Sequence, residues 1–461
     1  MKLLSPTDHL FLLGEDRRKP MHVAGLQLFT PPADAGDDFL NELWESALAF
    51  DQPESPFNQR MSLRPTGWHR VDDEHFDIHH HFRHSALPKP GRIRELLALV
   101  SRLHGTHCDR SRPLWEVTLI EGLNDGRFAL YTKIHHSLVD GMAAMRLGHQ
   151  ALSTDPTECG RPPIWAQKRV RRSRATTADA AQPASSGYIR ELTESIKGGY
   201  SLLPAAGRGL LDIFRDVEHN PANARPFHAP PTMLNVPICS SRRFAAQSYS
   251  LSRVKKLAKA SGCTVNDVSL AICAGALREY LLANNALPDK PLIAMVPVSV
   301  RAADSPEGGN QVAAILVNLA THIGDPGNRL RAIMQSTRYA KDRLASMSRL
   351  EQIAYTAATL GPTPLSIALR IDRKRPPFNV VISNVPGPKE TLYWNRAKLE
   401  EMYPVSIPYD GQAMNITLTS YEDQLGFGFT ACRQSVPSLQ RLLDYSEAAL
   451  ADLETALFAD G

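Results

Sequence analysis

Apolar and polar side chains alternate along residues 128–136, and this period of two predicts a β-strand. Its more apolar face carries Phe128, Leu130, Thr132, Ile134 and His136, and His135 falls on the opposite face. Apolar positions then recur at helical spacing over 139–152. The pattern therefore predicts a strand, a turn and a helix, with the two histidines at the turn.

The same periodicities predict further elements in both halves of the chain. In the first half, we expect strands at 23–29 and 114–120 and helices at 38–49 and 93–104. In the second half, we expect strands at 292–300, 314–321, 379–383, 413–419 and 426–431, and helices at 252–260, 266–284 and 328–345. Strands and helices mix without a strict βαβ rhythm, which predicts an α+β fold.

The chain of 461 residues is too long for one ordinary core, and its length predicts two domains of roughly 200 residues each. Pro, Ala, Ser and Thr are frequent over 154–186, which is typical of a linker. We therefore expect an N-terminal lobe over 1–153, a basic linker with amphipathic helices over 154–220, and a C-terminal lobe over 221–461.

Composition argues against several classes of protein. The apolar runs are far shorter than the roughly 20 residues that cross a bilayer, so no transmembrane helix is expected. A net charge of +4, without a phosphate loop or an RNA-binding motif, predicts no nucleic-acid partner. The six cysteines form no C-x-x-C pair, which predicts reduced thiols. The amino terminus lacks a secretory signal, so we expect the protein in the cytoplasm.

The predicted turn carries the sequence HHSLVDG over 135–141. An imidazole has an ordinary pKa of about 6.5, so it accepts and returns a proton at neutral pH. The spacing alone is ambiguous, because His135 lies five positions before Asp140 and His136 lies four before it. The spacing therefore fits both an acyltransferase with an H-x4-D motif and an acyltransferase with an H-x3-D motif. The strand face favours His136 as the catalytic base.

This segment resembles the HHxxxDG motif of the bacterial wax ester synthase/acyl-CoA:diacylglycerol acyltransferase family, within the chloramphenicol-acetyltransferase-like superfamily of CoA-dependent acyltransferases. Four other elements resemble that family in the same order along the chain: LSPTD followed by FL within 4–12, PLWE at 113–116, VNDV at 265–268 and SNVPGP at 383–388. Together they extend the resemblance over nearly the whole chain.

The resemblance implies two chloramphenicol-acetyltransferase-like lobes, each a mixed sheet with helices, and a tunnel between them. CoA would enter from one side and the acyl acceptor from the other. The candidates for the tunnel wall are small residues with a leucine between them, although ordinary helix packing also explains them: Ala357, Ala358, Leu360 and Gly361.

The resemblance also implies roles around the turn. His136 would take the proton of the acceptor hydroxyl, whose oxygen would attack the acyl-CoA thioester without an acyl-enzyme. Strand alternation puts His135 on the opposite face, where hydrogen bonding would let it position the turn, and Gly141 would allow a substrate to come close. The carboxylate of Asp140 would pair with Arg301 and hold the turn in shape.

The tetrahedral intermediate needs a hydrogen-bond donor for its oxyanion. Asn266, with Asp267 beside it, is our first candidate, because an amide donates without titrating. Asn266 equally fits the turn that opens the following helix. Both interpretations remain open from the sequence.

Two other patterns argue against competing chemistries. Five histidines crowd one short segment, at 75, 79, 80, 81 and 84, but no acidic or cysteine partner has a recognised ligand spacing, so we expect no metal site. The chain contains no G-x-S-x-G sequence, which argues against a serine esterase of the α/β-hydrolase kind.

Residues 168–174 place five positive charges in seven positions. Such a run is typical of a solvated connector, and it also suits contact with anionic lipid headgroups, at about 1 kcal/mol for each basic residue. With the amphipathic stretch that follows, it predicts an enzyme peripheral to the inner membrane or to lipid inclusions.

We therefore expect an O-acyltransferase with acyl-CoA as co-substrate, no bound cofactor, and a long-chain alcohol, diacylglycerol, or both as acceptor. A superfamily member that acylates a polyketide or peptide acceptor is the alternative enzyme. A lipid-binding scaffold without turnover is the alternative outside enzymes. The sequence indicates no particular oligomeric state.

Overall fold

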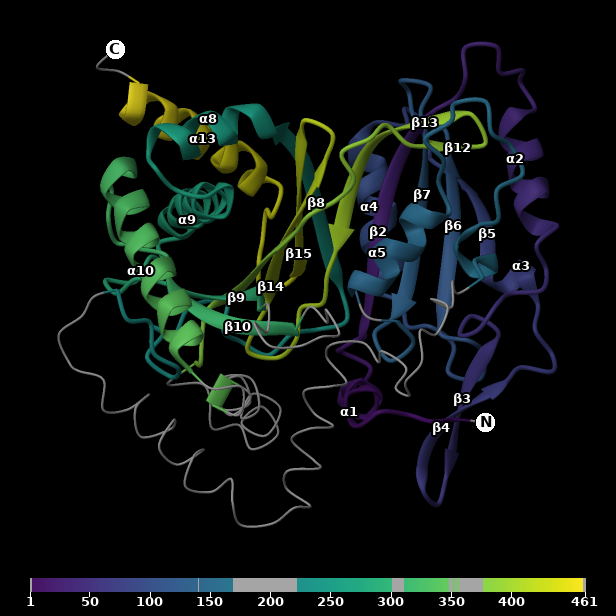
Figure 1. Ribbon diagram of the computed structural model, residues 1–461, viewed down its shortest axis with the longest axis horizontal. Helices are drawn as coiled ribbons and strands as arrows, with labels where there is room; N and C mark the ends of the chain where they lie inside the picture. Colours follow the sequence, from purple (N-terminus) through teal and green to yellow (C-terminus); the bar gives the residue numbers. More distant parts are fainter. Residues whose placement is uncertain are drawn as a thin grey trace, which may run out of the picture.

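The computed structural model describes residues 2–139, 141–168, 222–300, 311–347, 351–352, 355 and 376–458. Two lobes lie side by side, and each is built on a six-stranded sheet with helices (Figure 1). The expected two-lobed α+β architecture is thereby confirmed.

The N-terminal lobe contains strands β2 (His22–Thr30), β5 (Phe82–Ala86), β6 (Trp115–Glu121), β7 (Phe128–His135), β12 (Tyr393–Trp394) and β13 (Ala397–Val405). Its helices are α2 (Phe39–Leu48), α3 (Ile78–His81), α4 (Ile93–His104) and α5 (Gly141–Gln150). The sheet order is β12-β13-β2-β7-β6-β5. β5 runs parallel to β6, and the other neighbours are antiparallel.

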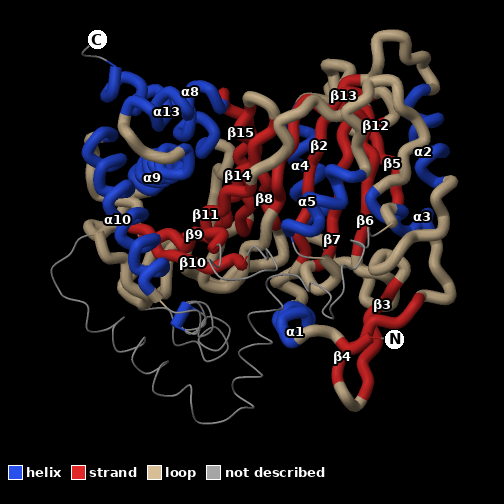
Figure 2. Tube along the Cα trace, viewed as in Figure 1, coloured by secondary structure: helices blue, strands red, loops and turns tan. Residues whose placement is uncertain are grey.

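The C-terminal lobe contains strands β8 (Arg242–Ser250), β9 (Ile293–Val300), β10 (Gln311–Asn318), β11 (Val380–Val385), β14 (Met414–Tyr421) and β15 (Gln424–Cys432). Its helices are α8 (Leu251–Ala260), α9 (Val265–Ala283), α10 (Pro326–Ser346) and α13 (Arg441–Phe458). The sheet order is β10-β9-β11-β14-β15-β8. Figure 2 shows the four helices grouped on one side of this sheet.

A third, small sheet lies at the lower edge of the view, in the order β1-β4-β3 (Figure 1). It is formed by β1 (Lys2–Leu3), β3 (Gln59–Arg64) and β4 (Gly67–Asp72). Helix α1 (Pro6–Gly14) follows β1, and the Ser5 side chain caps it by accepting from the backbone N–H of Asp8 at 3.2 Å. A short 3-10 helix, η1 (Ile164–Ala166), precedes the segment that is not described.

The periodic patterns located most of these elements correctly. α4 spans the predicted residues, and the other predicted elements end within two residues of their predicted bounds, except β10. β10 begins and ends three residues earlier than predicted. Its end at Asn318 is explained by Ala320, which adopts a positive φ of 48° that a strand does not allow. The patterns missed α1, α3, β1, β3, β4, β5, β8, β12, β13, η1 and α13.

The strand order corrects one predicted boundary. Residues 393–405 were expected in the C-terminal lobe over 221–461, but β12 and β13 complete the sheet of the N-terminal lobe. β13 pairs with β2 from Lys398 with Thr30 to Val405 with Ala24. This pairing covers an edge of β2 that would otherwise expose unpaired backbone groups.

Among the described residues, no single helix is both long and apolar enough to cross a membrane. The bent pair α8 and α9, with 105° between its halves, passes the same test of length and composition. Most of α9 is buried in the core of the C-terminal lobe. All six cysteines are free thiols.

Candidate functional site

The two histidines lie where β7 ends and the chain turns toward α5. His135 is the last residue of β7, and Gly141 is the first residue of α5. The backbone N–H of Leu138 donates to the carbonyl of His135 at 2.9 Å, which closes the turn. The backbone N–H of His136 donates to the carbonyl of Met21 at 2.9 Å. The predicted order of strand, turn and helix is confirmed.

His135 is fully buried, and its ring is engaged by the fold. The backbone N–H of Ser137 donates to Nδ1 at 3.1 Å, and the Ser137 hydroxyl lies 2.7 Å from the same atom. Because Nδ1 accepts, the ring proton lies on Nε2. Nε2 faces Oε1 of Glu15 at 3.5 Å. Both ring nitrogens are therefore directed at groups of the protein itself.

Glu15 is the buried carboxylate behind the histidine pair, with 3% of its side chain exposed. Burial raises its pKa, but His135, the backbone N–H of Met21 and the Arg110 side chain together lower it to about 2. Met21 donates at 3.1 Å, and Arg110 Nη2 lies 2.8 Å from Oε2. Glu15 is therefore a fixed negative charge near neutral pH.

His136 has a different environment from its neighbour. Its side chain is half-buried, and its ring stacks on Phe11 of α1 with centroids 4.1 Å apart and 18° between the planes. The aromatic contact fixes the plane of the imidazole. Of the two histidines, His136 is the one whose side chain remains partly open to solvent.

The amino-terminal signature packs against the histidine turn. Arg70 of β4 donates through Nη2 to the carbonyl of Ser137 at 2.6 Å and lies 3.4 Å from the Asp8 carboxylate. Burial raises the pKa of Asp8, and Arg70 opposes that shift. Phe11 belongs to the signature found in the sequence, whereas Glu15 and Arg70 carry no pattern that marks them. Helix α1 and Glu15, which follows it, thus form one side of the site.

The PLWE element supports the turn from behind. The carbonyl of Leu114 accepts from the backbone N–H of His135 at 2.9 Å. Trp115 is buried and donates through its indole N–H to the carbonyl of Phe57 at 2.8 Å. Glu116 lies 3.0 Å from the buried ammonium of Lys133. These contacts position the end of β7, and none of them involves the ring of His136.

The ND element opens α9. Thr264 caps the helix, because its hydroxyl accepts from the backbone N–H of Asp267 at 3.2 Å. The Asp267 carboxylate accepts from the backbone N–H and the hydroxyl of Thr264 at 3.0 and 2.7 Å. One carboxylate oxygen of Asp267, Oδ2, is therefore occupied by this capping box. Asn266, which was equally a candidate for holding the turn, is half-buried in the first turn of the helix.

The SNVPGP element begins inside the C-terminal sheet. Ser383 and Asn384 belong to β11, which runs parallel to both β9 and β14. A Cβ on Gly387 would lie 2.0 Å from the carbonyl oxygen of Ser420, so only glycine fits this crossing of two segments. The glycine of this element therefore has a packing role.

Several predicted site residues lie outside the described residues. They are Asp140, Arg301, Ala357, Ala358, Leu360 and Gly361. The pairing of Asp140 with Arg301 and the tunnel wall remain predictions. Most of the basic run and the amphipathic stretch after it, over 169–221, also lie outside the described part of the chain.

The histidine-rich segment before β5 serves the core. His81 is buried, and its Nδ1 lies 2.7 Å from the carbonyl of Trp115. Burial lowers the pKa of His81 to about 4, so the ring is neutral near pH 7. In the described ranges, no group of three or more His, Cys, Asp and Glu side chains is arranged to hold a metal ion.

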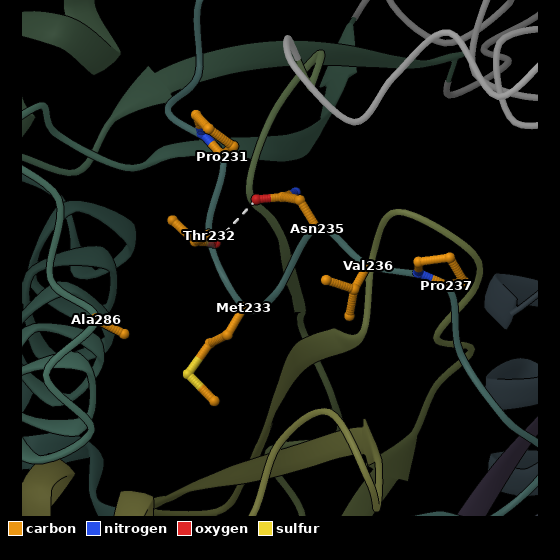
Figure 3. Close-up of a pocket in the computed structure, with 7 residues that line it drawn as sticks. All are labelled: Pro231, Thr232, Met233, Asn235, Val236, Pro237 and Ala286. Atoms are coloured by element: carbon orange, nitrogen blue, oxygen red, sulfur yellow. Dashed lines mark hydrogen bonds between the residues drawn. The ribbon is translucent and has the colours of Figure 1, made fainter.

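A cavity of about 610 Å³ opens in the C-terminal lobe beside the end of α9 (Figure 3). Its lining includes Thr232, Met233, Asn235 and Ala286. The amide of Asn235 is fully used, since it donates to the carbonyls of Phe378 and Gly411 and accepts from Thr232. None of the residues that line this cavity belongs to the motifs of the sequence.

Comparison with known proteins connects this geometry to one family. Residues 4–269 match the family model described as the wax ester synthase/diacylglycerol acyltransferase catalytic domain, and residues 308–454 match its C-terminal domain. The O-acyltransferase WSD of Acinetobacter baylyi is 46% identical over 449 residues, which cover 97% of this chain and 96% of that protein. A probable diacylglycerol O-acyltransferase of Mycobacterium tuberculosis, tgs2, is 45% identical over 463 residues, covering 99% and 100%.

Solved structures give the same result. The wax ester synthase/diacylglycerol acyltransferase from Marinobacter aquaeolei superposes with a TM-score of 0.78 at 46% identity, covering 98% of this chain and 99% of that chain. The first condensation domain of the CDA synthetase superposes with a TM-score of 0.58 at 16% identity, covering 99% and 96%. The second likeness concerns the fold alone.

Proposed function

Because the chain belongs to the wax ester synthase/diacylglycerol acyltransferase family, we propose that it transfers a fatty acyl group from acyl-CoA to the hydroxyl of a long-chain alcohol or of diacylglycerol. The observation that carries this proposal is the difference in environment between the two adjacent histidines. His135 is buried and directed at Glu15 and Ser137, whereas His136 is half-buried and stacked on Phe11.

In this proposal, His136 is the general base. Its Nε2 accepts the hydroxyl proton while the oxygen attacks the thioester carbonyl, which forms a tetrahedral oxyanion. The C–S bond then breaks, and the imidazolium returns the proton to the departing CoA thiolate. The products are an ester and CoA, and the protein carries no covalent intermediate.

The neighbours of His136 prepare it for this role. Phe11 holds the plane of its ring, and the hydrogen bond to Met21 fixes its backbone. His135 and Glu15 contribute by holding the turn in position, because they contact each other next to it. We also propose Asn266 as the oxyanion donor, supported by its half-buried place beside the capping box.

We further propose that the enzyme works in the cytoplasm, attached to the inner membrane or to lipid inclusions. Its acceptors are lipids, and residues 168–174 carry five positive charges that suit an anionic surface. Deletion of 168–174 should reduce binding to phosphatidylglycerol vesicles at low salt, measured by co-sedimentation. Unchanged binding would remove this part of the proposal.

The activity is tested by assaying purified protein with palmitoyl-CoA and either hexadecanol or diacylglycerol, following thiol release and ester formation. His136→Ala should lower kcat by about 10²-fold to 10⁴-fold, the usual contribution of a general base. His149→Ala is the matched control, since His149 is an exposed histidine of α5. Full activity in His136→Ala, or no ester from the wild type, would contradict the proposal.

A further inference from the structure

A second cavity, of about 310 Å³, lies at the junction of the lobes. It is formed by α4 of the N-terminal lobe, the start of β8, and Arg433, which follows β15. α4 and β8 are adjacent at this junction in Figure 1, and the backbone N–H of Phe244 donates to the Ser101 hydroxyl at 2.8 Å. The volume falls at the lower end of the roughly 300–1,000 Å³ typical of small-molecule sites. We refer to it as the arginine cleft.

Positive charge dominates the arginine cleft. Four arginines line it: Arg102, Arg242, Arg243 and Arg433. The single carboxylate among its lining residues, Glu95, is bound by Arg92, whose Nη2 lies 2.8 Å from Oε1. The cleft therefore holds an excess of guanidinium groups.

Three of these guanidinium groups lack a neutralising partner. Among the described residues, none forms an ion pair or hydrogen bond with the side chain of Arg102, Arg243 or Arg433. Burial lowers the pKa of Arg243, and repulsion from Arg433 and Arg94 lowers it further. Like charges held together in this way favour an anion that brings its own negative charge.

The fourth arginine is held in place by the fold. Arg242 is buried, and its guanidinium donates to the carbonyls of Cys239 and Arg18, the latter at 2.9 Å. The nearby Asp410 carboxylate lies 3.6 Å from both Arg18 and Lys19. Arg242 therefore adds a fixed positive charge to the wall of the cleft.

The arginine cleft is connected to the histidine turn through α4. The carbonyl of His104, at the end of α4, accepts from Nε2 of His22 at 2.8 Å. His22 pairs with His135 across β2 and β7. Arg102 lies in the last turn of the same helix. The end of α4 that carries Arg102 is thus packed against the strand pair that leads to the histidine turn.

We propose that the arginine cleft binds the phosphates of the acyl-CoA nucleotide. This inference rests on the proposed function, in which acyl-CoA is the one charged substrate and both acceptors are neutral. Guanidinium groups bind phosphate oxygens in a bidentate geometry, which makes arginine the preferred residue for this ligand. Because the arginines come from both lobes, the bound nucleotide would also bridge them.

The test compares two thioesters in the full-length protein. Palmitoyl-CoA carries the nucleotide, and the palmitoyl thioester of N-acetylcysteamine lacks it. In Arg243→Gln and Arg433→Gln, the ratio of kcat/KM for palmitoyl-CoA to kcat/KM for the truncated thioester should fall about tenfold for each substitution, the size of one lost charge-assisted hydrogen bond. A merely structural role would lower both values together and leave the ratio unchanged, which would overturn the inference.

Arg338→Gln is the matched control, because Arg338 is an exposed arginine of α10 away from the cleft, and it should leave the ratio unaltered. Calorimetric titration with adenosine 3′,5′-bisphosphate measures binding without turnover. Binding to the wild type that weakens in the double variant would support the inference even if the protein made no ester. Equal binding in both would overturn it. A loss of phosphatidylglycerol vesicle binding with an unchanged ratio would assign the cleft to a lipid surface and also overturn it.

Discussion

His135 and His136 are adjacent in the chain, but their rings face different surroundings. His135 pairs with His22 across the sheet and points its proton toward Glu15, so its function is to hold the end of β7. His136 lies one residue beyond the strand, against Phe11. The alternation of side chains predicted this separation of the two rings. It could not predict Glu15, because a carboxylate 120 residues earlier leaves no periodic signal at the turn.

Glu15→Gln tests the buried charge behind the turn. The folded state holds the pKa of Glu15 at about 2, below its ordinary value of 4.5, so the ionised carboxylate stabilises the fold. That stabilisation is fully present above about pH 4.5 and is lost as the pH falls toward 2. We expect Glu15→Gln to lower the free energy of unfolding by about 2 to 3 kcal/mol at pH 7. The difference in unfolding free energy between this variant and the wild type should be about 1 kcal/mol smaller at pH 4 than at pH 7.

Urea unfolding at pH 7, 5 and 4 measures this effect. Glu45→Gln on α2 is the control, since Glu45 is exposed and its change should not alter stability by more than about 0.5 kcal/mol. A gap between Glu15→Gln and the wild type that stays constant from pH 7 to pH 4 would show that Glu15 is not a buried charge of lowered pKa.

At the scale of elements, the strongest periodic patterns gave the correct helices and strands. α4 was located at both ends because its apolar positions recur at helical spacing, and Leu96, Leu97 and Val100 are buried in the structure. Elements such as β8 and β13 were missed for a physical reason. β8 has Arg242 and Arg243 at its start, and β13 carries charged residues next to buried ones. Each is stabilised by its neighbours in the sheet more than by its own alternation.

In the first turn of α9, a capping role and a role toward the substrate can be tested separately, at Thr264 and at Asn266. Thr264→Ala removes the hydroxyl that accepts from the backbone N–H of Asp267, so it should lower the free energy of unfolding by about 1 kcal/mol. Asn266→Ala leaves the capping box intact and should change stability by less than about 0.5 kcal/mol. If Asn266 donates to the oxyanion, its loss should lower kcat by about 10²-fold to 10³-fold.

Thermal unfolding and steady-state assays of the two variants distinguish these roles. Thr264→Ala is the internal control, because it should reduce stability with little change in kcat. If Asn266→Ala instead loses stability and keeps its kcat, Asn266 belongs to the cap and another group must stabilise the oxyanion.

At the scale of the whole molecule, the two lobes are joined by more than a linker. Phe244 and Ala246 of β8 share one buried cluster with Leu26 of β2, Tyr131 of β7 and Tyr403 of β13. The sequence motifs predicted two lobes, but no local pattern reports which strand of one segment completes the sheet of the other. Such pairing is decided by contacts between residues hundreds of positions apart. The predicted C-terminal lobe over 221–461 is therefore wrong for residues 393–405, which complete the sheet of the N-terminal lobe.

Close approach of β15 to β13 fixes the two sheets against each other, and Gly428 permits it. A Cβ at Gly428 would lie 2.0 Å from the carbonyl oxygen of Pro404, and one at Gly426 would lie 2.6 Å from that of Met402. Both distances fall below any tolerable contact, and both carbonyl oxygens are backbone atoms that cannot rotate away. We expect Gly428→Ala to separate the strands and to lower the free energy of unfolding by about 3 kcal/mol or more.

Gly25→Ala is the matched control for this junction. Gly25 pairs with the same Pro404 across β2 and β13, but a Cβ there meets no atom within 4 Å. Its replacement should therefore leave stability within about 1 kcal/mol of the wild type. Calorimetric melting of both variants measures the difference in their stability. Because the arginine cleft uses residues of both lobes, KM for palmitoyl-CoA should rise in Gly428→Ala alone. Equal melting temperatures for the two variants would show that the sheets adapt at this crossing, and the lobes would then be free to shift relative to each other.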